Sequence, residues 1–158
     1  MGAMGFALPA AIGAALVARG APTVMIAGDG GFQLNLQELQ TIAQHRLPVK
    51  MVILNNRCHG MVRQFQESYF EQRYASTMWG YSAPDFERVA HAYGIAAATL
   101  SDPSRIEEGL GAMWADPAAP FLLQVMIDPL ANVYPKIAFG HPMTEMEPFA
   151  KPVEMEGT

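Results

Sequence analysis

The chain has 158 residues, of which 51% are hydrophobic and 16% charged, so its composition is that of a single soluble α/β core. Its net charge is −5 and it has no cluster of Lys and Arg, whereas binding of nucleic acid needs a basic stripe, so we expect no nucleic-acid partner. The apolar stretch 2–17 has no basic segment before it, contains Pro9 and is shorter than the roughly 20 apolar residues of a membrane span, so we expect a buried helix and no membrane segment.

The first predicted elements are a helix and two strands. Pro9 disfavours helical geometry at the residue before it and Gly20 favours a helix end, which together predict a helix over 9–19. Residues 23–27 and 49–54 are apolar, contain β-branched side chains and have strand length. We therefore expect a helix followed by two buried strands.

A second helix is predicted between these strands. Asn35 has a side chain suited to a helix N-cap, and Glu38 follows three residues later, which is the spacing of a capping box. Four apolar residues then share one helical face that should pack against the sheet: Leu36, Leu39, Ile42 and Ala43.

The second half of the chain continues the alternation. Residues 56–80 have no clean period, so we expect a short helix over 62–69 and then irregular chain, the most mobile part of the protein. Ser82 and Asp85 predict the start of a helix that Gly94 ends. The apolar positions of this helix are Phe86, Val89, Ala90 and Tyr93.

Two more strands enclose the last predicted helix. The strands are expected over 95–100 and 121–127. Asp102 followed by Pro103 is typical of a helix start, because proline is tolerated at the first helical position. The expected core positions of this helix are Ile106, Leu110, Met113 and Trp114.

The order of these elements predicts an α/β fold with a doubly wound, mostly parallel sheet flanked by helices. We expect residues 1–128 to form this domain and the proline-rich residues 129–158 to form a C-terminal tail that wraps over it or is partly disordered. A doubly wound sheet usually has a strand before its first helix, and no such strand is predicted here. We therefore expect the domain to be truncated at its N-terminus.

Polar residues follow the first two predicted strands. The run Gly28-Asp29-Gly30 comes after one strand and Asn55-Asn56 after the other, and ligands gather at the carboxyl ends of strands in an open parallel sheet. A carboxylate and an amide oxygen suit Mg²⁺, which usually keeps phosphate oxygens among its ligands, and glycine allows the backbone to approach a phosphate. Such residues often serve only as turn residues, but the spacing of the two motifs favours a site for a metal ion and a diphosphate.

The motifs resemble those of a known family. Residues 1–15, 28–42 and 47–56 resemble the diphosphate-binding domain of thiamin-diphosphate enzymes, and most closely that of the acetolactate (acetohydroxyacid) synthase large subunit. The resemblance is dense from residue 2 to about residue 77 and continues to about residue 140. It implies the thiamin-diphosphate-binding fold, with thiamin diphosphate and Mg²⁺ as cofactors.

The resemblance also assigns residues to these cofactors. Those implied to bind thiamin diphosphate are Gly2, Met4, Gly28, Gly30, Gly31, His59, Gly60 and Met61. In the family, backbone groups at the positions of Gly2 and Met4 meet the aminopyrimidine ring, and the side chain at Met4 holds the cofactor bent. The implied metal ligands are Asp29, Asn56 and the backbone carbonyl of Cys58. Asn55 would order the turn.

The catalytic and substrate-binding residues are only partly assigned by the resemblance. In the family, the glutamate that activates the cofactor lies on another domain, so no catalytic residue is assigned in this chain, and neither Glu38 nor Glu67 matches its motif. Phe65 is implied to lie near the substrate, at a position where well-known synthases have a tryptophan that touches the acceptor 2-keto acid. Lys136 stands where an apolar residue is typical. These departures leave the donor and acceptor keto acids open.

Other chemistry is disfavoured by the sequence. Cys58 and His59 are adjacent, and neighbours in sequence rarely point at each other, which argues against a Cys-His nucleophile. A single cysteine excludes an internal disulfide and fits a reducing cytoplasm, where we expect the protein. The four histidines lack the spacing of zinc ligands, and a nucleotide-binding module is disfavoured because neither a Walker A pattern nor Gly-x-Gly-x-x-Gly is present.

The resemblance implies a function for the chain as part of a larger enzyme. This enzyme would decarboxylate a 2-keto acid such as pyruvate and transfer the acyl unit to a second 2-keto acid, in branched-chain amino acid biosynthesis. The alternatives are a 2-keto acid decarboxylase or oxidase of the same superfamily, and an isolated, inactive domain. We expect a homo-oligomer with pyrimidine-binding and central domains, the latter with FAD possible. Alone, the chain should bind cofactor weakly or not at all, show no turnover, and self-associate through exposed apolar faces.

Overall fold

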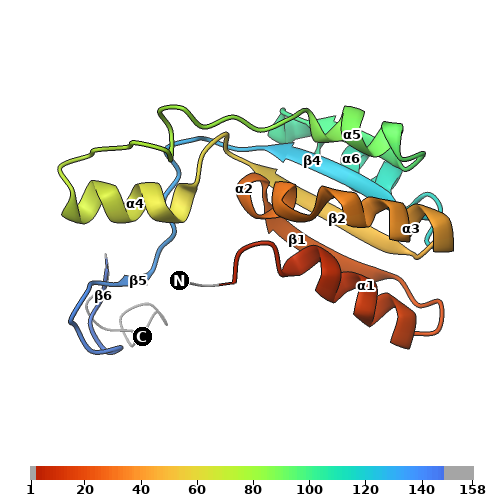
Figure 1. Cartoon of the computed structure of the whole chain (residues 1–158), viewed down its shortest axis with the longest axis horizontal. Helices are drawn as coiled ribbons and strands as arrows, with labels where there is room; N and C mark the ends of the chain where they lie inside the picture. Colours follow the sequence, from red (N-terminus) through yellow and green to blue (C-terminus); the bar gives the residue numbers. More distant parts are fainter. Residues whose placement is uncertain (1–2, 148–158) are drawn as a thin grey trace.

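The computed structural model describes residues 3–147 (Figure 1). Its main sheet has the strand order β1-β2-β4-β3, and all three pairings are parallel. The strands are β1 (Thr23–Gly28), β2 (Val49–Asn55), β3 (Ala96–Leu100) and β4 (Phe121–Met126). The helices are α1 (Ala7–Val17), α2 (Asp29–Phe32), α3 (Leu39–His45), α4 (Gly60–Tyr69), α5 (Phe86–Ala92) and α6 (Ile106–Trp114), with 3-10 turns η1 (Gln33–Glu38) and η2 (Pro103–Arg105). The predicted α/β fold with a parallel sheet flanked by helices is confirmed.

The strand register decides which side chains meet which helices. Met25 is paired with Met51, which is paired with Leu122, so these three buried side chains share one face of the sheet. That face forms the main core with α1, α3 and α5. Val52 and Leu123 belong to the opposite face, which forms a smaller cluster with α6. The core therefore lies on both sides of the sheet and holds the strand ends in fixed positions.

The first helix begins two residues before its predicted start. Pro9 lies in the first turn of α1, where backbone N–H groups have no intrahelical acceptor, so the missing N–H of proline costs no helical hydrogen bond. The helix ends at Val17, and the chain reverses through Arg19 and Gly20, whose φ angles are 50° and 91°. Gly20 thus follows the helix as predicted, while the last two predicted helical positions belong to the turn.

The predicted capping box is wrong. Asn35 lies inside η1, and its side-chain amide donates to the backbone carbonyl of Gly5 at 2.6 Å. Glu38 is the N-cap residue of α3 and makes no side-chain capping hydrogen bond. The amide of Asn35 instead ties the loop before α1 to η1, because that carbonyl lies outside the helix and needs a donor. Leu39 and Ile42 of α3 are buried, as predicted.

The starts of the later helices match the sequence prediction. The Asp85 carboxylate accepts the N–H of Arg88 at 3.2 Å and caps α5. Asp102 accepts the N–H of Ser104 at 2.9 Å and caps η2, which leads into α6. The predicted core stripe of α6 is only partly right, since Met113 is buried and the other three members stay exposed: Ile106, Leu110 and Trp114. The reason is that α6 packs mainly on β3 and β4, which is too narrow a surface to cover its whole apolar face.

The region between β2 and α5 contains one helix and a long loop. The helix predicted over 62–69 is α4, and the loop after it folds back so that the N–H of His59 donates to the carbonyl of Thr77 at 3.0 Å. The mobility expected for this region stays a prediction.

After β4 the chain leaves the sheet and runs along α4. A short antiparallel hairpin follows, formed by β5 (Lys136–Ile137) and β6 (Met146–Glu147). Figure 1 shows α4 and this hairpin at a distance from the sheet, beyond the carboxyl ends of the parallel strands. The predicted division between a domain ending at residue 128 and a tail stays a prediction, and the part of the tail beyond residue 147 lies outside the described residues. Within residues 3–147, no helix has the length and apolarity to cross a bilayer.

Candidate cofactor and metal site

A cavity of about 490 Å³ lies at the carboxyl ends of β1 and β2. The strand ends contribute Gly28 and Leu54, and the turn that opens α2 contributes residues 29–31. The first turn of α4 contributes residues 60–62, and the segment after β4 contributes residues 131–133. The position of the cavity is that of a ligand site in an open parallel sheet.

Most of the residues predicted to bind cofactor or metal line this cavity. They are Met4, Gly28, Asp29, Gly30, Gly31, Asn56, Cys58, His59, Gly60 and Met61. Gly2 lies outside the described residues. Phe65 lines a neighbouring cavity of about 440 Å³ instead, which shares Met61 and Val133 with the first. The structure thus brings the two polar motifs together, while the role of each residue stays a prediction.

Asp29 is the buried acid of the cavity, with 1% of its surface exposed. Its Oδ2 accepts a hydrogen bond from the Tyr81 hydroxyl at 2.9 Å, and Gln33 Nε2 donates to that hydroxyl oxygen at 3.3 Å. Burial raises the pKa of Asp29, while the hydrogen bond from Tyr81, those from backbone amides including that of Gly30, and the charge of His59 act to lower it. Burial and the bond to Asp29 raise the pKa of Tyr81, so the phenol keeps its proton and donates.

Two glycines let side chains pack closely around the cavity. A Cβ on Gly30 would lie 2.4 Å from His59 Nδ1, and one on Gly60 would lie 2.5 Å from Asn56 Nδ2. The His59 ring in turn meets the Tyr81 ring edge to face, with centroids 4.6 Å apart. Because α4 begins at Gly60, the N–H groups of its first turn have no intrahelical acceptor and are suited to an anion such as a diphosphate.

The two asparagines order the loop after β2. Asn55 Oδ1 accepts the N–H of Arg57 at 3.0 Å, so Asn55 orders the turn as predicted. Asn56 Oδ1 accepts the N–H of Cys58 at 3.2 Å. An amide oxygen has two lone pairs, so this bond leaves one for a cation. Asn56 lines the cavity, and Asn55 points instead to Gln124, whose Oε1 accepts from Asn55 Nδ2 at 3.2 Å.

The donors around Asp29 fit a hard cation. Residues 3–147 contain no group of three or more His, Cys, Asp and Glu side chains placed to hold a metal ion. The cavity offers one carboxylate, the amide oxygen of Asn56 and main-chain groups, and Mg²⁺ accepts such an oxygen set when phosphate oxygens and water complete it. The Cys58 thiol lies 3.4 Å from the carbonyl oxygen of Pro129, and burial raises its pKa, so it stays protonated.

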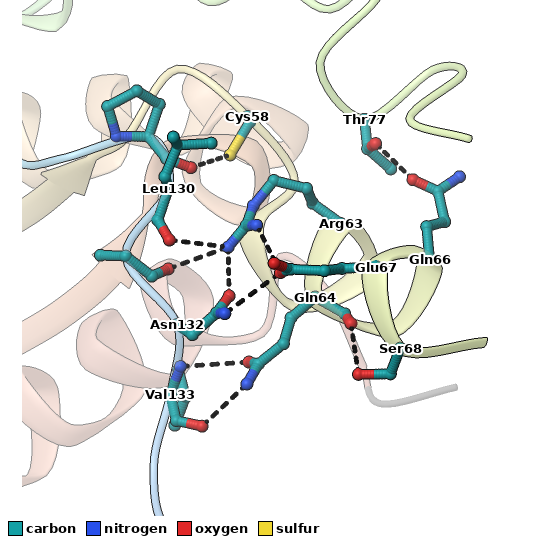
Figure 2. A network of polar contacts seen from close by, with 12 residues as sticks. Cys58, Arg63, Gln64, Gln66, Glu67, Ser68, Thr77, Leu130, Asn132 and Val133 are labelled. Atoms are coloured by element: carbon teal, nitrogen blue, oxygen red, sulfur yellow. Dashed lines mark hydrogen bonds and ion pairs between the residues drawn. The ribbon is translucent and has the colours of Figure 1, made fainter. Parts of the chain in front are cut away.

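Arg63 fastens the segment after β4 to α4 (Figure 2). This arginine is 1% exposed, and its Nη2 donates to the backbone carbonyls of Leu130 and Ala131 at 3.2 and 3.1 Å. Its Nη1 donates to Glu67 Oε2 at 2.9 Å. Asn132 completes the network, since its Oδ1 accepts from Arg63 and its Nδ2 donates to Glu67 at 3.1 Å. The Nη2 group of this buried guanidinium thus faces three acceptors in the segment after β4, while Nη1 pairs with Glu67 on the same helix and Nε has no hydrogen-bond partner among the described residues.

Gln64 extends this connection by one residue. Its amide donates to the carbonyl of Val133 at 3.0 Å and accepts the N–H of Val133 at 3.1 Å, as Figure 2 shows. Residues 131–133 form one wall of the cavity, and the first turn of α4 forms another wall. Arg63 and Gln64 therefore hold these two walls together.

Sequence reasoning missed these contacts and Tyr81. The Arg63–Glu67 spacing on a predicted helix was the only available signal, since residues four apart on a helix meet. Tyr81 is 52 residues from Asp29 in the chain, and the partners of Arg63 after β4 are mainly backbone carbonyls, so no local pattern marks either contact.

The family of thiamine pyrophosphate enzymes matches this chain over most of its length. The family described as "Thiamine pyrophosphate enzyme, C-terminal TPP binding domain" matches residues 1–125. The chain therefore belongs to this family and corresponds to its C-terminal cofactor-binding domain. The resemblance inferred from the motifs is confirmed.

Curated relatives point to one branch of the family. The chain is 41% identical over 152 residues to "Acetolactate synthase large subunit" of Pyropia yezoensis, covering 96% of this chain and 26% of that protein. It is 41% identical over 146 residues to "Acetolactate synthase isozyme 2 large subunit" of Escherichia coli K12, covering 92% of this chain and 26% of that protein. It is 40% identical over 157 residues to "Probable acetolactate synthase large subunit" of Methanocaldococcus jannaschii, covering 99% and 25%. The chain thus spans about a quarter of the length of these relatives.

A solved structure shares the fold. "Rhodococcus jostii RHA1 thiamine diphosphate-dependent 4-hydroxybenzoylformate decarboxylase" matches with a TM-score of 0.69 and 28% identity, covering 79% of this chain and 23% of that chain. This likeness agrees with the α/β thiamin-diphosphate-binding fold.

Proposed function

We propose that the chain is the Mg²⁺- and thiamin-diphosphate-binding domain of a carboligase of acetolactate synthase type. The whole enzyme decarboxylates a 2-keto acid such as pyruvate and transfers the acyl unit to a second 2-keto acid. The observation that carries the proposal is the cavity in which Asp29, after β1, lies with Asn56, after β2, beside the N-terminus of α4. The names of the curated relatives support the choice of reaction.

The residues of the cavity have distinct proposed roles. Asp29 and Asn56, with the backbone carbonyl of Cys58, hold the metal ion. The N–H groups of the first turn of α4 hold diphosphate oxygens. Met4 is 51% exposed and lines the cavity, so its apolar side chain is available to the cofactor. When bound, thiamin diphosphate supplies an electron sink for the decarboxylation of a 2-keto acid.

The rest of the catalytic site belongs to other parts of a longer enzyme in this proposal. A pyrimidine-binding domain supplies the activating glutamate, a central domain completes the polypeptide with FAD possible there, and two or more copies assemble. The substrate is a small 2-keto acid, with no role for nucleic acid or a membrane. The chain alone is expected to be inactive.

A 2-keto acid decarboxylase is the second candidate. The likeness to a solved structure that is named a 4-hydroxybenzoylformate decarboxylase favours it. Phe65 also leaves room for it, since this position departs from the tryptophan of well-known synthases. The Phe65 ring lines a cavity beside the proposed cofactor site, where it meets the Tyr69 ring with centroids 4.7 Å apart.

Product analysis distinguishes these reactions. The enzyme that contains this domain is incubated with pyruvate, thiamin diphosphate and Mg²⁺, and the products are identified by mass spectrometry. Acetolactate is expected from the carboligase. Acetaldehyde as the main product would identify a decarboxylase, and acetyl products would identify an oxidase. The 158-residue chain alone serves as a control, from which no product is expected.

A further inference from the structure

Tyr81 reaches the candidate metal site from the long loop between α4 and α5. Its hydroxyl is the donor to Asp29 Oδ2 at 2.9 Å, since a carboxylate can only accept. Gln33 Nε2 occupies a lone pair of the same hydroxyl oxygen at 3.3 Å. The direction of the O–H bond is therefore set from two sides.

The ring of Tyr81 is also fixed in place. It meets the His59 ring with the two ring centroids 4.6 Å apart and an angle of 70° between the ring planes. His59 in turn packs against Gly30, where a Cβ would be 2.4 Å from its Nδ1. The hydroxyl thus sits on a packed support that holds one oxygen of the buried Asp29 in one orientation.

We propose that Tyr81 is a positioning residue that keeps Asp29 a one-oxygen ligand and so makes the site prefer Mg²⁺ over Ca²⁺. The inference rests on the proposed function, because it requires Asp29 to bind the metal. The bond from Tyr81 fixes the orientation of the carboxylate, which opposes the rotation that would bring both of its oxygens onto one cation. Mg²⁺ needs near-octahedral ligands at short distance, whereas Ca²⁺ takes more ligands and accepts a carboxylate through both oxygens. Groups that orient a ligand in this way tune the metal that it binds.

The substitution Tyr81→Phe tests this role because it removes the hydroxyl and keeps the ring against His59. Losing an orienting partner typically lowers metal affinity about 10-fold, so we expect that loss for Mg²⁺. Ca²⁺ affinity should fall less or rise, because the carboxylate becomes free to turn both oxygens toward the ion. The ratio of the two affinities is the decisive quantity, since general damage to the fold would weaken both metals alike.

Two further variants complete the design. Gln33→Leu removes the donor to the Tyr81 oxygen and leaves the bond to Asp29, so we expect a smaller change of the ratio in the same direction. Tyr74→Phe is the matched control, because Tyr74 lies on the same loop and meets Trp79 edge to face at 6.1 Å, away from the cavity. It should leave the ratio unchanged. Thermal unfolding without metal checks that each variant folds.

The measurement is calorimetric titration of the enzyme that contains this domain with thiamin diphosphate, over a series of Mg²⁺ or Ca²⁺ concentrations. A fall in the Mg²⁺ to Ca²⁺ preference in Tyr81→Phe supports the inference. An unchanged preference, while Asp29→Ala abolishes metal dependence, overturns this inference and leaves the proposed function standing. Metal dependence that survives Asp29→Ala, or a wild-type enzyme that binds thiamin diphosphate with neither metal, overturns both.

Discussion

The packing of the candidate site depends on the absence of a side chain at Gly30. The glycine was predicted from its motif to admit a phosphate, and the structure adds that it also admits the His59 ring. No sequence pattern connects positions 30 and 59, because their contact depends on how the ends of β1 and β2 lie side by side.

The substitution Gly30→Ala should therefore damage the site. The added Cβ would displace the His59 ring, which supports Tyr81. Overpacking of this kind costs about 1–3 kcal/mol of unfolding free energy. Chemical denaturation measures this cost. Gly13→Ala is the matched control: Gly13 lies inside α1 with no atom within 4 Å of the added Cβ, so alanine should stabilise the protein by about 0.5–1 kcal/mol. Equal effects of the two substitutions would contradict this account.

At the scale of elements, α4 and the segment after β4 behave as one unit. The side chains of Arg63 and Gln64 bind backbone groups of Leu130, Ala131 and Val133 and the side chain of Asn132. Residues 130–133 belong to no strand of the described sheets. Side chains thus take the place of a β ladder in satisfying this backbone.

Loss of the guanidinium should loosen this connection. Arg63→Met removes the donor to the carbonyls of Leu130 and Ala131 and the ion pair with Glu67. Hydrogen bonds to a charged group contribute about 1.5–3 kcal/mol, so we expect the unfolding free energy to fall by about 2–3 kcal/mol. Amide hydrogen exchange at Val133 should speed up. Arg105→Met is the control, because Arg105 and Glu108 form an exposed ion pair, and solvent-exposed pairs contribute little to stability. A loss no larger than the control's would show that the network does not hold the segment.

The element scale also shows where sequence patterns succeed and fail. The strands and the caps at Asp85 and Asp102 were predictable, because apolar β-branched runs and Asx-type capping act locally. The wrongly predicted capping box at Asn35 had the right local pattern, but the Asn35 side-chain amide donates instead to the backbone carbonyl of Gly5, 30 residues earlier in the chain. The cavity position was predictable from the strand ends, whereas Tyr81 and Arg63 act through contacts that exist only in the folded chain.

The whole molecule leaves part of its sheet uncovered by the described residues. Val24 and Ile26 of β1 are 51% and 62% exposed and share a face with the exposed Leu54 of β2. The helix on this side, α6, packs on β3 and β4. An exposed apolar patch of this kind favours association.

We expect the isolated chain to self-associate through this face. Ile26→Lys should shift the sedimentation profile toward monomer, because it places a charge in the middle of the patch. Gln40→Lys adds the same charge at an exposed position on α3 and should leave the profile unchanged. A wild-type chain that sediments as a monomer at high concentration would show that the face does not drive association.

The most direct test of the proposed site is calorimetric titration of the chain with thiamin diphosphate, with and without Mg²⁺, in the wild type and in Asp29→Ala. Asp29 is the buried carboxylate of the cavity, so its loss should abolish Mg²⁺-dependent binding while the fold persists. We expect weak binding by the wild type that requires Mg²⁺, and none by the variant. Binding of equal strength in both proteins, or binding that is indifferent to Mg²⁺, would contradict the assignment of Asp29 to the metal.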